Sequence, residues 1–120
     1  MRALIISLLL TVTLTAAILI NARYVSEVTE EMKSLVEEID QGLSPDKAFE
    51  DLYDKWSEHK KFFAISVSFE DIDHITEYIT RLGSSLESGD ADDITQHCAL
   101  LQNFFDDVIR HERISLLNIL

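Results

Sequence analysis

The chain has 120 residues with only one Pro and three Gly, so it contains too few turn-forming residues for a many-stranded fold and suits a few long helices. Its formal net charge is −12, but all 22 acidic residues follow Arg23, where only eight Lys and Arg remain, so that part carries −14. Such an acidic region is repelled by phosphate backbones, which disfavours nucleic-acid binding. Because Cys98 is the only cysteine, no intramolecular disulfide can form.

The stretch from Ala3 to Ile20 is uncharged and dominated by Leu, Ile, Val and Ala. A helix of this length extends about 27 Å, close to the roughly 30 Å thickness of a bilayer's hydrocarbon core. We therefore expect residues 1–23 to be a transmembrane anchor and residues 24–120 to form an acidic helical domain. Tyr24 stands where an aromatic residue of the membrane interface is expected.

A cleaved signal peptide is the alternative to an anchor, and Arg2 and the small residue Ala22 are features that would suit it. The apolar run is longer than the usual h-region of about 7–15 residues and holds no Pro or Gly, so we favour the anchor. The flanking charges are nearly balanced, and the very short N-terminal tail favours an N-terminus inside the cell. We therefore predict a single-pass protein of the cell membrane with an extracytoplasmic domain.

Apolar residues recur at helical spacing directly after the anchor. The residues Val25, Val28, Met32, Leu35 and Ile39 are separated by steps of 3, 4, 3 and 4. This spacing predicts a helix that is continuous with the anchor and ends near Gly42, a residue suited to a left-handed helix stop. A narrow seam of this kind fits a parallel homodimer as well as packing within one chain.

Three further helices are expected in the rest of the chain. The second begins at Pro45 and is interrupted at 66–69, the third is capped by Ser68, and the fourth is capped by Asp90. The clearest period belongs to the third helix, with Ile72, Ile75, Ile79, Leu82 and Leu86 at steps of 3, 4, 3 and 4. Short connections place successive helices antiparallel. We predict an all-α fold, in which an N-terminal transmembrane helix continues into an antiparallel bundle of about four helices.

The fourth helix is followed by an apolar tail. It contains Ile114, Leu116, Leu117, Ile119 and Leu120. We expect the tail to pack back on the bundle, because an exposed apolar patch would favour aggregation.

The four histidines raise the question of a metal site, because His74, His97 and His111 each follow an Asp by three or four residues. An acidic chain produces such pairs by chance, and the paired Glu-x-x-His motifs of a di-iron bundle are missing. We therefore expect no metal and no cofactor. Cys98 lies on an apolar seam and is expected to be a buried structural thiol, and with no nucleophile motif we expect a protein that is not an enzyme.

Basic residues gather at one place in the domain, where Lys55, Lys60 and Lys61 surround Trp56 and a pair of Phe residues. The simpler interpretation puts the rings in the core and the lysines in solvent. The alternative is a partner surface, made of Lys55, Trp56, Lys60 and Lys61, that meets a protein or rests against the outer leaflet.

Several short motifs together suggest a family. These are Trp56, Lys60-Lys61-Phe62-Phe63, Glu70-Asp71-Ile72-Asp73 and the terminal Asn118-Ile119-Leu120, all behind an N-terminal membrane helix. With them the chain resembles the bacterial domain of unknown function 4363 family, small single-pass proteins found mainly in Gram-positive bacteria. The family commonly has a His before its Glu-rich segment, where this chain has Phe69 and places its nearest imidazole at His74. The resemblance implies the membrane-anchored architecture and brings no established activity.

These observations lead to two functional hypotheses. The first is a non-enzymatic interaction or scaffolding protein of the bacterial envelope, tethered to the membrane and bound to an unidentified protein partner. The second is an extracytoplasmic domain that senses cations or another ligand through its carboxylates and histidines.

Overall fold

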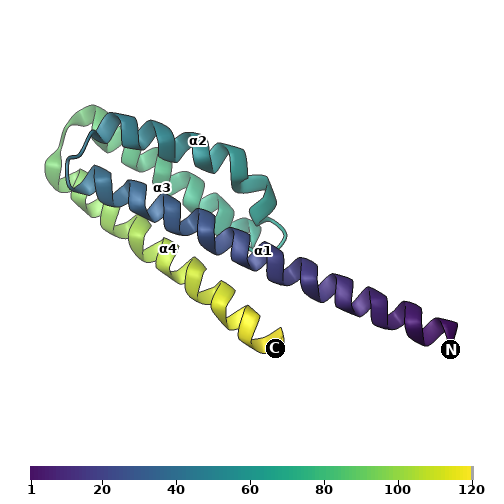
Figure 1. The fold of residues 1–120 in the computed structure, drawn as a ribbon. Helices are drawn as coiled ribbons and strands as arrows, with labels where there is room; N and C mark the ends of the chain where they lie inside the picture. The colour runs from purple at the N-terminus through teal and green to yellow at the C-terminus, as the bar shows by residue number, and fades with distance from the viewer. Residues whose placement is uncertain (120) are drawn as a thin grey trace.

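A computed structural model of the chain describes residues 1–119, with the side chain of Ile119 and all of Leu120 outside the described part. In residues 1–119 it contains four helices and no strand (Figure 1). The helices are α1 (Arg2–Asp40), α2 (Pro45–Phe63), α3 (Phe69–Ser88) and α4 (Ala91–Ile119). The predicted all-α fold of about four helices is confirmed.

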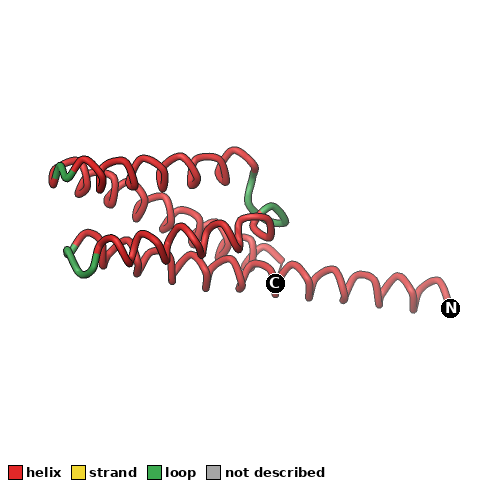
Figure 2. The backbone as a smooth tube through the Cα atoms, turned by 90° about the horizontal axis from the view of Figure 1, so that it is seen from above, coloured by secondary structure: helices red, strands yellow, loops and turns green. Residues whose placement is uncertain are grey.

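The helices form an up-and-down bundle in which α1 and α3 each pack against α2 and α4. Successive helices are antiparallel, and the connections alternate between the two ends of the bundle (Figure 2). The N-terminal half of α1 projects beyond the other helices, so the molecule measures 67 × 24 × 23 Å (Figure 1). The bundle is therefore a compact body on a long free helix.

The helix ends lie close to where local signals place them. Gly42 and Gly89 follow α1 and α3 with φ of 74° and 73°, the left-handed conformation that glycine adopts without a Cβ clash. Pro45 opens α2, where its missing N–H costs no hydrogen bond. Ser68 caps α3, since its hydroxyl accepts a hydrogen bond from the N–H of Asp71 at 3.2 Å.

The core of the bundle is built from the apolar seams of all four helices. On α1, four of the five seam residues are buried, but Leu35 is only partly buried and Val36 takes a place in the core. The residues without any exposed surface include Leu52 and Phe63 of α2 and Leu101 and Phe105 of α4. Because α1 packs on two neighbours at once, its buried face is wider than a single seam.

Cys98 is one of the core residues of α4 and has no exposed surface. Burial, together with the charge of Asp40, raises the pKa of its thiol to about 11. The expected structural thiol is therefore both shielded from solvent and protonated at neutral pH.

We expect Cys98 in the folded protein to react with a maleimide far more slowly than an exposed thiol at pH 8, because both access and the thiolate are lacking. Thiol labelling followed by mass spectrometry measures this rate, and unfolding in denaturant should restore it. A Leu43→Cys variant supplies the exposed thiol for comparison, since Leu43 is 58% exposed. Equal rates for the two thiols in the folded protein would contradict the buried position.

The apolar tail packs back on the bundle only in part. Ile114 and Leu117 remain 48% and 73% exposed, because α4 continues as a straight helix beyond its last buried residue, Glu112, instead of turning back. The prediction is thus wrong for these two residues, whereas Leu116 between them is half-buried. For Ile119 and Leu120 the prediction concerns side chains outside the described part.

Candidate functional site

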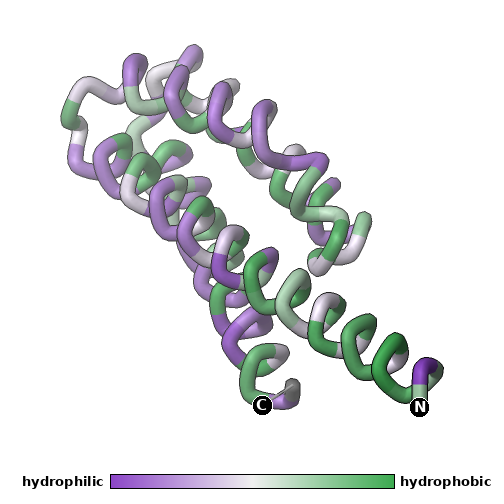
Figure 3. Tube along the Cα trace, turned by 45° about the vertical axis from the view of Figure 1, so that its right-hand side comes forward, coloured by the Kyte–Doolittle hydropathy of each residue, from purple (hydrophilic) through white to green (hydrophobic). Residues whose placement is uncertain are grey.

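The N-terminal half of α1 is long and apolar enough to cross a membrane, and no part of its 18-residue apolar window is buried in the described chain. Figure 3 shows that hydrophobic residues predominate along this free segment, whereas hydrophobic and hydrophilic residues alternate along the helices of the bundle. A core helix of a soluble domain would bury such a window. This segment is the first candidate contact surface of the molecule, because none of its apolar window is buried among the described residues.

The free segment is fixed to the bundle where it enters it. The side-chain amide of Asn21 donates a hydrogen bond of 3.4 Å to the carbonyl oxygen of Phe62, at the end of α2. One turn further, the Tyr24 hydroxyl is hydrogen-bonded to Nδ1 of His59, and its ring meets the edge of Phe62 with 6.2 Å between centroids. These contacts place the α2–α3 connection against the end of the apolar segment.

Trp56, a member of the predicted partner surface, lies in the core. Its side chain is 3% exposed, its indole Nε1–H donates a hydrogen bond of 2.9 Å to the Thr76 hydroxyl, and its ring packs edge-on against Phe63 at 5.2 Å. Buried indoles normally have their N–H satisfied in this way. A partner could reach the Trp56 ring only if α2 and α3 separated.

The three lysines of the predicted partner surface are on the outside of α2. Lys55 forms an ion pair with Glu31 of α1, with 2.6 Å between Nζ and Oε2. Lys60 and Lys61 are exposed, and Nζ of Lys61 lies 5.1 Å from the centre of the Phe62 ring. The structure therefore brings Lys60, Lys61 and Phe62 together at the surface and separates them from Trp56.

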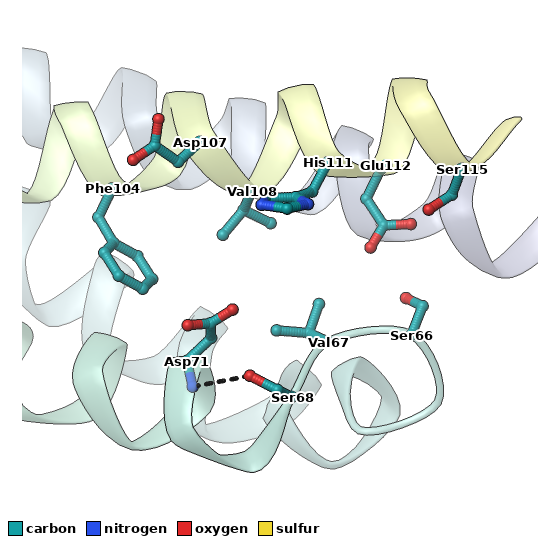
Figure 4. Close-up of a pocket in the computed structure, with 10 residues that line it drawn as sticks. All are labelled: Ser66, Val67, Ser68, Asp71, Phe104, Asp107, Val108, His111, Glu112 and Ser115. Carbon is teal, nitrogen blue, oxygen red and sulfur yellow. Dashed lines mark hydrogen bonds between the residues drawn. The ribbon is translucent and has the colours of Figure 1, made fainter. Parts of the chain in front are cut away.

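A cleft of about 370 Å³ lies between α4 and the α2–α3 connection, at the end of the bundle nearest the apolar segment. Its walls include Asp71 from the first turn of α3 and Phe104, His111 and Glu112 from α4 (Figure 4). Carboxylates, an imidazole and an aromatic ring therefore line one hollow.

Glu112 is the unusual residue of this cleft. Its side chain is 3% exposed, and its Oε2 has no hydrogen-bond partner among the described residues. In Figure 4 its carboxyl group points from α4 toward the α2–α3 connection and Ser66. Burial raises the pKa of Glu112, and the Ser66 hydroxyl and the charge of His111 oppose this effect only in part. The structure thus holds a carboxylate in a site that disfavours its charge.

Replacing Glu112 with Gln should stabilise the protein by about 1 kcal/mol at pH 7, because an unpaired buried charge is removed. Since the folded-state pKa of Glu112 is raised above the ordinary value of 4.5, the folded protein holds this proton more tightly than the unfolded chain does. The contribution of Glu112 to stability therefore falls as pH rises from the unfolded-state pKa through the folded-state pKa. The difference between E112Q and wild type should therefore vanish below about pH 4.

Thermal unfolding of both proteins in detergent, followed by circular dichroism between acidic and neutral pH, measures this difference. Glu50→Gln is the matched control, because Glu50 is exposed on α2 and should give no pH-dependent gain. A variant E112Q that is less stable than wild type at pH 7 would show that the Glu112 carboxylate is satisfied in the folded state.

The Asp–His pairs do not assemble into a metal site. Within residues 1–119 no three His, Cys, Asp or Glu side chains are placed to hold a metal ion. His74 instead stacks on Tyr78, with 5.9 Å between centroids, and His59 is the hydrogen-bond partner of Tyr24. These imidazoles act in packing and hydrogen bonding.

Ser85, His97 and Asp93 form a cluster that resembles a catalytic triad in composition. The Ser85 hydroxyl lies 2.8 Å from His97 Nδ1 and 3.0 Å from Asp93 Oδ2. In a triad the base uses one ring nitrogen for serine and the other for the acid, whereas here Nδ1 faces both partners. Ser85 is also only 2% exposed, so the geometry is that of a bridge between α3 and α4.

Glu112 was not predicted as a site residue, although the chain contains a signal for it. Glu112 continues the seam of α4 through Leu101, Phe105 and Val108, at steps of 4, 3 and 4. An acidic residue at a seam position predicts a buried carboxyl group. The facing residue Ser66 lies in a connection, where no periodic pattern applies.

The fold and these sites define an antiparallel four-helix bundle that carries a free apolar helix at its N-terminus. Residues 19–119 match the family described as Domain of unknown function (DUF4363), which is most of the chain. The chain belongs to this family, as its motifs predicted. No curated protein and no solved structure matches the chain.

Proposed function

We propose that this protein is a non-enzymatic interaction or scaffolding protein of the bacterial envelope, tethered to the cell membrane with its bundle on the extracytoplasmic side. The observation that supports the tether is the division of α1, whose first half is apolar and unpacked and whose second half is a core element of the bundle. In a bilayer a helix satisfies its own backbone and its apolar side chains meet lipid.

The junction between the two halves favours a retained anchor over a cleaved signal peptide. Ala22, the small residue that would suit a cleavage site, is 1% exposed, and Val25 has no exposed surface. The side-chain amide of Asn21 is hydrogen-bonded to the carbonyl oxygen of Phe62, and α1 is helical throughout this region. Cleavage after Ala22 would therefore remove a buried residue and the Asn21 contact from the folded bundle.

The remaining exposed part of the predicted partner surface is the pair Lys60 and Lys61. Few basic residues occur in the domain, and this pair is neither buried nor joined to a carboxylate by an ion pair in the described residues. A protein partner with an acidic or aromatic patch would meet it close to the membrane, where tethering raises the effective concentration of both molecules.

Crosslinking in native membranes tests this partner surface. The double variant K60E/K61E should lose the crosslinked partner while its helicity stays unchanged, because both side chains are exposed. The matched control is K47E/R81E, which changes the charge equally at exposed positions elsewhere on the bundle. Retention of the partner by K60E/K61E would reject the lysine pair as its binding surface.

A second candidate function, the sensing of a small cation, is supported by the unpaired carboxylate oxygen of Glu112 in the cleft. A cation that binds only the folded protein raises its stability, by about 2.7 kcal/mol at a hundred times the dissociation constant. Thermal unfolding with and without Mg²⁺, Ca²⁺ or spermidine measures this. The midpoint should rise for wild type and Glu50→Gln, and stay constant for Glu112→Gln. No rise with any of the three in wild type would count against sensing.

A further inference from the structure

We propose that the anchor-side end of the bundle is a lipid-contact surface that rests in the interfacial layer of the bilayer. We call it the lipid-facing end, and it consists of Phe62, Ile65 and Phe69 around the α2–α3 connection and Ile114 and Leu117 near the end of α4. This inference rests on the proposed membrane tether, which places the bilayer next to this end.

The first observation is the exposure of these side chains. Ile65 and Phe69 are 68% and 76% exposed, Leu117 is 73% exposed, and Phe62 and Ile114 are close to half exposed. Figures 1 and 2 show that the α2–α3 connection and the end of α4 lie at the same end of the bundle, where the free half of α1 emerges. Apolar patches of this kind mark contact surfaces.

The second observation is the position of this end along α1, which sets how deep it lies in a bilayer. Phe62 and Ile65 line an apolar groove of about 490 Å³ together with Ala17 and Ile20 of α1. Ile20 is the last residue of the segment assigned to the hydrocarbon core, so a bilayer that covers this segment reaches the level of Ile65. Aromatic residues such as Phe62 and Phe69 are well suited to this depth.

The third observation is the distribution of charge between the two ends. Basic residues close to the lipid-facing end are Lys60, Lys61, Arg110 and Arg113, and the carboxylates there are Glu70 and Asp71 at the start of α3 and Asp107 and Glu112 on α4, with Asp107 paired to Arg110. The opposite end, where α1 meets α2 and α3 meets α4, carries Glu37, Glu38, Asp40, Asp46, Asp90, Asp92 and Asp93, with Lys47 as the nearby cation. The opposite end is therefore much more acidic than the lipid-facing end, and because anionic headgroups repel it more strongly, the bundle's own charge favours this orientation.

The occupant is inferred to be lipid because the surface is continuous with the anchor. The groove begins on residues of the apolar segment itself, and its other wall is the α2–α3 connection. A protein that covered Ile65 would have to enter the same layer of the bilayer. We therefore assign the apolar side chains of this end to lipid and leave the lysine pair Lys60 and Lys61, the sides and the acidic end of the bundle to proteins.

The test uses the full chain in phosphatidylethanolamine–phosphatidylglycerol vesicles, with an environment-sensitive dye attached to one introduced cysteine at a time. Ile65→Cys reports on the lipid-facing end, Leu43→Cys on the opposite end and Val12→Cys on the anchor. Cys98 stays in place, because it is buried and its labelling in wild type gives the background. Lipids that carry a shallow spin label quench dyes that lie in the interfacial layer.

The dye at residue 65 should be quenched several-fold more than the dye at residue 43, with its emission shifted to shorter wavelength. Equally weak quenching of the dyes at residues 65 and 43 would overturn the lipid-facing end. If deeply labelled lipid still quenches the dye at residue 12 strongly, the membrane tether remains supported. Absence of lipid quenching at 12 would overturn the tether and the inference together.

Discussion

Replacing Phe105 with Ala is expected to lower the free energy of unfolding by about 3–5 kcal/mol, one of the largest effects available to a single substitution in this bundle. Phe105 has no exposed surface and belongs to the core cluster to which all four helices contribute. Removing its ring leaves a cavity that closes only if α4 and its neighbours shift toward each other and give up their close packing elsewhere. Small domains have only about 5–15 kcal/mol of stability in total, so the variant should be close to unfolding.

Denaturant unfolding of the full chain in detergent, followed by circular dichroism, measures this loss. Phe69→Ala is the matched control, because it removes the same ring from a side chain that is 76% exposed. Its effect should stay within about 0.5 kcal/mol. Similar losses for the two variants would mean that Phe105 is not a core residue.

Arginine at both Leu10 and Val12 is expected to remove the protein from the membrane. On insertion scales an arginine near the middle of a membrane helix costs about 2.5–3.5 kcal/mol, so two of them oppose insertion by roughly 6 kcal/mol. Both side chains are highly exposed in the free half of α1, so their replacement leaves the contacts of the bundle intact.

Cell fractionation followed by alkaline carbonate extraction measures membrane insertion. Leu43→Arg is the control and should remain in the membrane fraction, since Leu43 is exposed in the connection between α1 and α2. If L10R/V12R resists carbonate extraction as the wild type does, the apolar half of α1 is not the element that holds the protein in the membrane.

The helices were predictable because their signals are local. The stops at Gly42 and Gly89, the start at Pro45 and the cap at Ser68 depend on a few neighbouring residues each. The step pattern of α1 indicated which side faces the core, but it could not show that two helices pack on this side. For that reason the burial of Val36 in place of Leu35 was not predicted.

The candidate sites were less predictable because they join residues that are distant in the chain. Glu112 could have been recognised from its seam position, yet its cleft exists only because the α2–α3 connection lies beside α4. For Trp56, composition favoured both the core and a partner surface, and the contact with Thr76 decides for the core. Ile114 and Leu117 were predicted to pack on the bundle because the prediction assumed that water surrounds the whole domain, whereas both side chains are exposed.

The continuity of α1 has a mechanical consequence. No Pro or Gly occurs between Arg2 and Asp40, so the chain offers no hinge between the part proposed to lie in lipid and the bundle. Tilting of the apolar segment must swing the whole bundle through the same angle. In a thick bilayer the apolar segment is shorter than the hydrocarbon core, and covering the core would pull the bundle down onto the headgroups. In a thin bilayer the segment is longer than the core, so the segment and the bundle would tilt together. The orientation of the acidic end relative to the membrane would thus depend on the local thickness of the bilayer.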